Sequence, residues 1–236
     1  MAKKVNPFDL ESAPPFDGFP KDAVQFLRDL AANNNREWFA ENKDRYESSV
    51  RAPMLSLLTT LEARMRAFDS TIVIEPKKAM YRIFRDVRFS ADKSPYKTWV
   101  AAAFTHSGAD RKTDAAYYFH ITPDEVGIGG GLYAPSGDQL RKLRAAVDTR
   151  HEELRAILAE QRYAKIFGGL TGEELTRVPA GFDKEHPAGD LLRRKQFLAW
   201  ATVPMKAVYG AGFADTVYEH CVAMAPLMRW LLAHSR

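Results

Sequence analysis

The sequence has a single cysteine and no long apolar run. Cys221 is alone among 236 residues, which excludes an intramolecular disulfide framework and is typical of a reducing compartment. No stretch approaches the roughly 20 apolar residues that a transmembrane helix needs, so we expect no membrane partner. The first residues, MAKKVNPFDLESAPPF, contain two lysines but no apolar segment after them, unlike a secretory signal. We therefore expect a cytoplasmic protein.

The overall charge is also small. The chain has 34 Lys and Arg against 30 Asp and Glu, with 46% hydrophobic and 27% charged residues. These values are ordinary for a soluble globular protein that buries a sizeable core. Residues 1–15 are polar, end in prolines and have no periodicity, so we predict a disordered tail there. No change of composition divides the remainder, and we predict one domain over residues 16–236.

Helical spacing marks both ends of the chain. Apolar residues recur at helical intervals over 23–30, and Asn34 with Glu37 resembles a capping box that opens a second helix. That second pattern runs to residue 65, but Pro53 interrupts it, so we predict a kink or two abutting helices. A helical seam over 213–231 closes the chain.

The middle of the chain has the pattern of strands. Pro123-Asp124 predicts a hairpin turn, and Ser136 with Gln139 predicts a capping box that opens a further helix. Helices, then grouped strands, then helices again predict an α+β fold: a single sheet of mostly antiparallel strands packed by N-terminal and C-terminal helices. The predicted strands are residues 71–74, 99–104, 116–122, 126–133 and 197–203.

Two segments rich in glycine invite functional interpretations. Gly129 to Gly131 lack the spacing of a phosphate-binding loop, and we interpret them as strand glycines that another chain segment approaches closely. Thr171 to Asp190 form a long stretch of Gly, Pro and charge, which is typical of a functional or flexible loop. The sequence leaves open whether this loop covers a site.

The most distinctive segment is residues 77–97, where seven basic residues accompany two acidic ones. The whole chain is only +4, so the positive excess is local. Guanidinium groups match carboxylate and phosphate oxygens, which predicts an anion site. The ligand-binding candidates are Arg82, Arg85, Arg88, Lys93 and Lys97.

Three neighbouring residues are catalytic candidates. Asp86 would orient the guanidinium groups, and Asp92 or Tyr96 would exchange a proton. Fixed cations stabilise charge in phosphoryl-transfer and hydrolytic reactions, so these are the expected classes if a reaction occurs. The sequence identifies no cofactor and gives no metal-binding motif. A minor alternative joins His106 and His120 across strands, with Asp86 or Asp92 as an oxygen ligand.

Other interpretations of the same segment stay open. The Arg and Asp residues could form a structural network that holds an irregular loop or grips an acidic protein partner. Basic residues between aromatic ones could instead bind nucleic acid by charge and stacking. Arg193-Arg194-Lys195 form a second basic cluster, most simply a solvated face. The polar residues from Asn33 to Trp38 are most simply a helix stop and cap, and their functional alternative is a wall of the same site.

The segment also resembles the signature of an uncharacterised bacterial family, domain of unknown function 2461. The signature is R-x-x-R-D-x-R-F-x-x-(D or N)-K-x-x-Y, and Arg82 to Tyr96 match it at every defined position. Other stretches also look familial: Phe16 to Phe19, Asn33 to Phe39, Pro179 to Phe182, His186-Pro187 and Leu191 to Lys195. The resemblance implies that these residues are a hallmark of the family, and it implies no activity.

Overall fold

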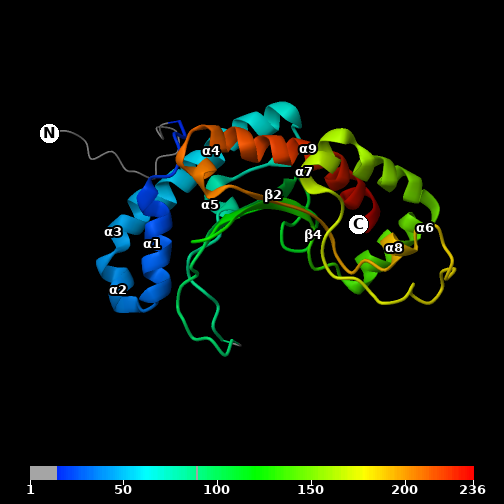
Figure 1. Cartoon of the computed structure of the whole chain (residues 1–236), viewed down its shortest axis with the longest axis horizontal. Helices are drawn as coiled ribbons and strands as arrows, with labels where there is room; N and C mark the ends of the chain where they lie inside the picture. Colours follow the sequence, from blue (N-terminus) through cyan, green and yellow to red (C-terminus); the bar gives the residue numbers. More distant parts are fainter. Residues whose placement is uncertain (1–14, 89) are drawn as a thin grey trace. The chain divides into compact units, whose positions relative to one another are not determined.

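A computed structural model describes residues 15–88 and 90–236 of the chain (Figure 1). It contains a five-stranded antiparallel sheet in the order β1-β2-β3-β4-β5, with helices before and after the strands in sequence. The predicted α+β class is therefore confirmed. The tail predicted over residues 1–15 lies outside the described residues, apart from residue 15.

The five predicted strands are all present, within two residues of the expected bounds. The first is much the shortest, and all are separated by turns or helices. The strands are β1 (Ile72–Val73), β2 (Val100–His106), β3 (Ala116–Ile121), β4 (Val126–Leu132) and β5 (Phe197–Val203). The predicted hairpin turn joins β3 to β4, where the N–H of Thr122 donates to the carbonyl of Glu125 at 2.8 Å.

The helices also follow the predicted periodicity. They are α1 (Lys21–Ala32), α2 (Arg36–Glu41), α3 (Lys43–Tyr46), α4 (Ala52–Phe68), α5 (Pro76–Ala79), α6 (Gly137–Ala159), α7 (Gln161–Phe167), α8 (Gly189–Leu192) and α9 (Gly212–Ser235). A π-helical turn, η1 (Glu47–Arg51), and a 3-10 turn, η2 (Met205–Tyr209), complete the set for the described residues. None of these helices is both long enough and apolar enough to cross a membrane.

The chain divides into two compact units. The first contains the described residues up to 104, together with 119–127 and 202–218. The second contains residues 105–118, 128–201 and 219–236. The boundary runs through strands β2 to β5, so each unit holds part of the sheet. The prediction of one domain over residues 16–236 stays a prediction.

The first unit has an apolar helical core. Phe26, Leu27 and Leu30 of α1 are fully buried, as the period of the sequence predicts. Both α1 and α4 contact η1. Pro53 lies in the first turn of α4, directly after this π-helical turn. Proline has no N–H to donate, so the predicted interruption is confirmed and takes the form of a π-helical turn between two helical segments.

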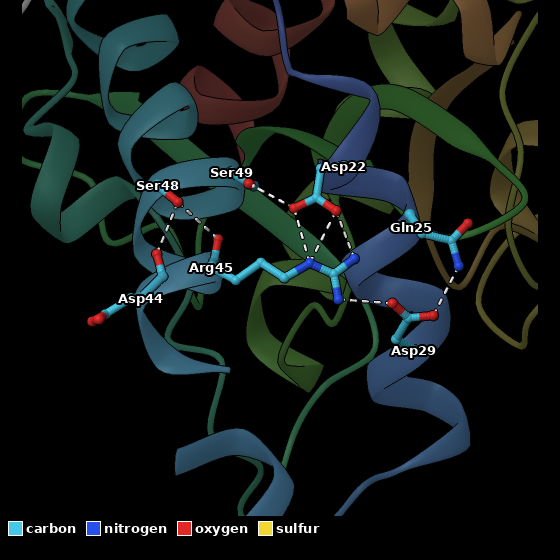
Figure 2. A network of polar contacts seen from close by, with 7 residues as sticks. All are labelled: Asp22, Gln25, Asp29, Asp44, Arg45, Ser48 and Ser49. Carbon is cyan, nitrogen blue, oxygen red and sulfur yellow. Dashed lines mark hydrogen bonds and ion pairs between the residues drawn. The ribbon is translucent and has the colours of Figure 1, made fainter. Parts of the chain in front are cut away.

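A polar network ties α3 to α1 in the same unit. Figure 2 shows the guanidinium of Arg45 between two carboxylates of α1, those of Asp22 and Asp29. Its Nη2 lies 2.6 Å from Asp22 Oδ1, and its Nη1 lies 2.8 Å from Asp29 Oδ2. Ser49 adds a hydrogen bond from its hydroxyl to Asp22 at 2.8 Å. Hydrogen bonds from Arg45 lower the pKa of both aspartates.

In the second unit, β4 is closely approached by its neighbour. Gly131 has φ +123°, and a Cβ there would lie 2.0 Å from the carbonyl oxygen of Phe197 in β5. A Cβ on Gly129 would lie 2.3 Å from the carbonyl oxygen of Ala199. The glycines therefore allow close strand packing, as predicted, because any side chain would collide with the backbone of β5.

The predicted capping box at the start of α6 is confirmed. Ser136 Oγ accepts from the N–H of Gln139, and the Gln139 side chain accepts from the N–H of Ser136 at 2.9 Å. The long loop after α7 begins beside β5, because the N–H of Thr171 donates to the carbonyl of Leu198 at 2.7 Å. The start of the predicted loop is therefore tied to an edge strand.

Candidate functional site

The signature segment forms a closed loop in the first unit. Phe84 and Tyr96 make an isolated antiparallel bridge, and the N–H of Arg85 donates to the carbonyl of Pro95 at 2.9 Å. The N–H of Lys97 donates to the carbonyl of Ile83 at 2.7 Å. These bonds bring the two arms of the segment together, so that residues early and late in the signature become neighbours.

Asn34, between α1 and α2, holds one arm of this loop. Its Nδ2 donates to the carbonyl of Tyr96 at 2.9 Å, and its Oδ1 accepts from the N–H of Tyr96 at 3.0 Å. The predicted cap at Asn34 is wrong by one residue, because Asn35 caps α2 and accepts from the N–H of Trp38 at 2.9 Å. Asn34 is instead a long-range clamp.

Tyr96 is anchored by its ring as well as its backbone. It is 5% exposed, and its ring stacks on Phe39 of α2 with centroids 4.1 Å apart. Burial raises the pKa of the Tyr96 hydroxyl. Phe84 also packs against the ring of Tyr96, with ring centroids 5.4 Å apart, yet Phe84 stays 53% exposed. The loop is therefore joined to the helices by an aromatic cluster.

Arg88 and Asp86 form a bidentate ion pair within the loop. Arg88 Nε lies 2.9 Å from Asp86 Oδ1, and Nη2 lies 2.7 Å from Oδ2. These hydrogen bonds from Arg88 lower the pKa of Asp86 to about 2. Asp86 is therefore ionised at neutral pH and holds the guanidinium of Arg88. Its predicted role of orienting the guanidinium groups around a ligand stays a prediction.

Arg85 forms an ion pair with Asp92 across the loop. Asp92 Oδ1 also accepts from the N–H of Ser94 at 2.9 Å and from its hydroxyl at 2.5 Å. These hydrogen bonds, those of Ser94 first, hold the pKa of Asp92 far below its usual range. Among the described residues, the Arg85 guanidinium donates to Asp92 alone, which leaves most of its five N–H groups without a protein acceptor.

Lys93 and Lys97 both hydrogen bond to the backbone. Lys93 Nζ donates to the carbonyl of Val87 at 3.0 Å, and Lys97 Nζ donates to the carbonyl of Arg82 at 2.9 Å. The Lys97 ammonium also lies 4.9 Å from the ring centroid of Trp99, within the range of a cation–π contact. Both lysines therefore help to fix the loop, and they still carry positive charge at its surface.

Most of these residues line one pocket, with a volume of about 670 Å³. Six of the lining residues belong to the basic segment 77–97: Arg85, Asp86, Asp92, Ser94, Tyr96 and Lys97. The remaining wall comes from Ala31, Asn34, Thr98 and Trp99. Arg82, Arg88 and Lys93 are not among the lining residues, although Arg82 is exposed and adds to the local field that lowers the pKa of Asp86.

The other candidates are not among the residues that line this pocket. His120 faces Glu125 at 3.4 Å, and the ring of His106 lies against Tyr117 with centroids 5.9 Å apart. In the part of the chain that is described, no three His, Cys, Asp or Glu side chains are placed to hold a metal ion. In the second basic cluster, Arg194 pairs with Glu174 at 3.0 Å and is only partly exposed.

Comparison with known proteins supplies one match. The family model described as "Conserved hypothetical protein (DUF2461)" matches residues 22–230, which covers most of the chain. The chain belongs to the DUF2461 family. The resemblance of the signature segment is therefore confirmed. No curated protein and no solved structure matches this DUF2461 protein.

Sequence reasoning missed several walls of the pocket. Asn34 was interpreted first as a helix cap, with a wall of the site as the alternative, and Thr98 and Trp99 were not assigned to the site. The signal that could have identified Thr98 and Trp99 is their position, since they directly follow Lys97, the last residue of the basic segment 77–97. In this DUF2461 protein the run Asn33 to Phe39 supplies both the clamp Asn34 and the stacking ring Phe39, and both hold Tyr96 of the signature.

Proposed function

We propose that this DUF2461 protein binds a small molecule with an anionic group, a phosphate or a carboxylate, in the polar pocket of the first unit. The observation that carries the proposal is the convergence of six residues of the basic segment 77–97 on one pocket. Its volume of about 670 Å³ lies within the usual range for small-ligand sites. A hydrogen-bond network that only held the loop would not need to line a cavity.

Arg85 is the principal anion-binding group in this proposal. It lines the pocket, its side chain is 29% exposed, and Asp92 engages one end of its guanidinium. The remaining N–H groups provide the fork that matches carboxylate or phosphate oxygens. Lys97 adds a second cation to the wall. Exposed Arg82 lies outside the wall and strengthens the positive field around it.

The proposal is for binding rather than for a particular reaction. Hydrogen bonds from Arg88 hold the pKa of Asp86 at about 2, and burial raises the pKa of Tyr96. Neither pKa is shifted toward neutrality, where a general acid or base acts best. The expectation of a phosphoryl-transfer or hydrolytic reaction stays a prediction, and these groups give it no direct support.

A thermal-unfolding screen tests the proposal. Wild-type protein is heated with phosphate, phosphosugars, nucleotides and small carboxylates, and each stabilising compound is repeated with Arg85→Ala. A ligand at 100 times its Kd adds ~2.7 kcal/mol, which raises Tm by roughly 5–10 °C in a chain of this size. We expect that rise to fall sharply in Arg85→Ala.

The matched control is Arg141→Ala, because Arg141 forms a similar exposed ion pair with Asp138 and lines no part of the pocket. Arg141→Ala should respond to the ligand as wild type does. Equal stabilisation of wild type and Arg85→Ala would contradict the proposed role of Arg85. A screen in which no anion stabilises wild type would contradict the anion site itself.

One observation supports nucleic acid as an alternative partner. Phe84 is 53% exposed and lies two residues after the exposed Arg82 in the chain, so a base could stack on it near a cation. Phosphate contacts of this kind weaken steeply with salt. Oligonucleotide binding that disappears between 50 and 200 mM salt, together with no small-molecule ligand, would favour this alternative over the pocket.

A further inference from the structure

The pocket carries charges of both signs in equal number. Arg85 and Lys97 line it as cations, and Asp86 and Asp92 line it as anions. Hydrogen bonds from Arg88 to Asp86 and from Ser94 to Asp92 lower the pKa of both carboxyls, so both are charged at neutral pH. A ligand with negative charge alone would meet two fixed carboxylates as well as the two cations.

Each carboxylate can also accept one more hydrogen bond. Oδ1 of Asp86 accepts two hydrogen bonds from Arg88, whereas its Oδ2 accepts one from the described residues. Oδ1 of Asp92 likewise accepts two from Ser94, and its Oδ2 accepts one, from Arg85. A carboxylate has about four acceptor sites. One site on each Oδ2 is therefore left for a donor on a ligand.

We propose that the ligand is a zwitterion: a small molecule of the amino-acid class, with a carboxylate that binds Arg85 and an ammonium group that binds Asp86. This inference rests on the proposed function and narrows its ligand class. A ligand charge placed beside a protein charge of the same sign weakens binding, whereas a ligand charge placed beside one of opposite sign favours that ligand over others. A zwitterion satisfies both signs in the wall, and a multiply charged phosphate does not.

The rest of the pocket suits the side chain of such a ligand. Trp99, Ser94 and Thr98 also line it, so one aromatic residue and two hydroxyl-bearing residues accompany the charged groups. A volume of about 670 Å³ exceeds the needs of the charged groups alone, so it leaves room for a bulky side chain or a second residue. Amino acids and dipeptides are therefore the probes of choice.

Matched ligands test the inference by isothermal titration calorimetry on the full chain. Each standard amino acid and a set of dipeptides are titrated at millimolar concentration. Every binder is compared with two analogues, the acid that lacks the ammonium group and the amine that lacks the carboxylate. An exposed ion pair contributes up to ~1 kcal/mol, so we expect either deletion to weaken binding measurably, by up to about fivefold.

A charge-neutralising variant locates the ammonium group. Asp86→Asn keeps an acceptor oxygen but removes the charge. It should therefore reduce the ratio by which the amino acid binds more tightly than its deaminated acid, which is the affinity advantage of the ammonium group. Asp138→Asn, which removes the acidic partner of Arg141, is the control and should leave that advantage unchanged. An advantage unchanged in Asp86→Asn would overturn the assignment of the ammonium group to Asp86.

The outcomes separate this inference from the proposed function. If the deaminated acids or phosphate bind as tightly as the amino acids, the zwitterion is overturned and the anion site stands. If the amines bind as tightly as the amino acids, the carboxylate contact with Arg85 is overturned. If no zwitterion and no anion binds the wild-type protein, the inference and the proposed function both fail.

Discussion

Replacing Asn34 with alanine tests how the pocket wall is held. The wild-type side chain makes two hydrogen bonds to the backbone of Tyr96, at 2.9 and 3.0 Å, and Tyr96 is 5% exposed. Each such bond contributes about 1 kcal/mol net. Asn34→Ala should therefore destabilise the protein by ~2 kcal/mol, since both backbone groups of Tyr96 lose their partner at once.

The assay is thermal or urea unfolding of the wild type and its variants. A loss of ~2 kcal/mol corresponds to a fall in Tm of roughly 4–8 °C for a chain of this length. Asn34→Asp should lie between wild type and Asn34→Ala, because a carboxylate still accepts from the N–H of Tyr96 but cannot donate to its carbonyl. Anion binding should weaken in both variants, because Asn34 and Tyr96 line the pocket.

Asn33 provides a matched control one residue away. Its side chain makes one exposed hydrogen bond, from Nδ2 to the carbonyl of Asp29 at 2.9 Å. Asn33→Ala should cost ~0.5 kcal/mol or less. If Asn34→Ala were no more destabilising than Asn33→Ala, the clamp between Asn34 and Tyr96 would not hold the loop, and the reasoning would be refuted.

Three further predictions concern the rest of the molecule. Gly131→Ala should cost ~3 kcal/mol or more in urea unfolding, because a Cβ collides with backbone at a positive φ; Gly137→Ala, where a Cβ meets nothing within 4 Å, should cost less than ~0.5 kcal/mol. The pKa of Asp22 is lowered in the fold, so its contribution to stability is present above the unfolded pKa of about 3.9 and is lost as pH falls through the folded pKa. The free energy of unfolding should therefore fall less steeply with decreasing pH in Arg45→Met than in wild type. An equal slope in the two proteins would rule this out. Burial raises the pKa of the Cys221 thiol, so a thiol reagent should label it only at the rate of unfolding; rapid labelling of folded protein would contradict its burial.

Local signals in the sequence predicted most of the fold. The five strands and the main helices follow from periodicity, and the box of Ser136 and Gln139 locates the start of α6 correctly. The predicted N-cap of α2 was wrong because Asn34 and Asn35 are equally good capping residues by local criteria. The choice between them depends on Tyr96, 62 residues away in sequence, and no local rule contains that contact.

The sequence predicted which residues come together better than it predicted the contacts that each one makes. Five residues of the signature line the pocket, including Arg85, Asp86 and Tyr96. The sequence could not show that Lys93 and Lys97 donate to the carbonyls of Val87 and Arg82. The segment is an irregular loop rather than a helix or strand, so spacing alone does not define which side chains point into the cavity.

The most direct test of the central claim is to follow the indole N–H signal of Trp99 by NMR during a ligand titration. The signal is assigned with Trp99→Phe, and the indole of Trp230, which is 5% exposed and does not line the pocket, serves as the internal reference. The account predicts that an anionic or zwitterionic ligand shifts the Trp99 signal in a saturable manner and leaves Trp230 unmoved. Binding that leaves the Trp99 signal unchanged would show that the ligand lies elsewhere and would contradict the account.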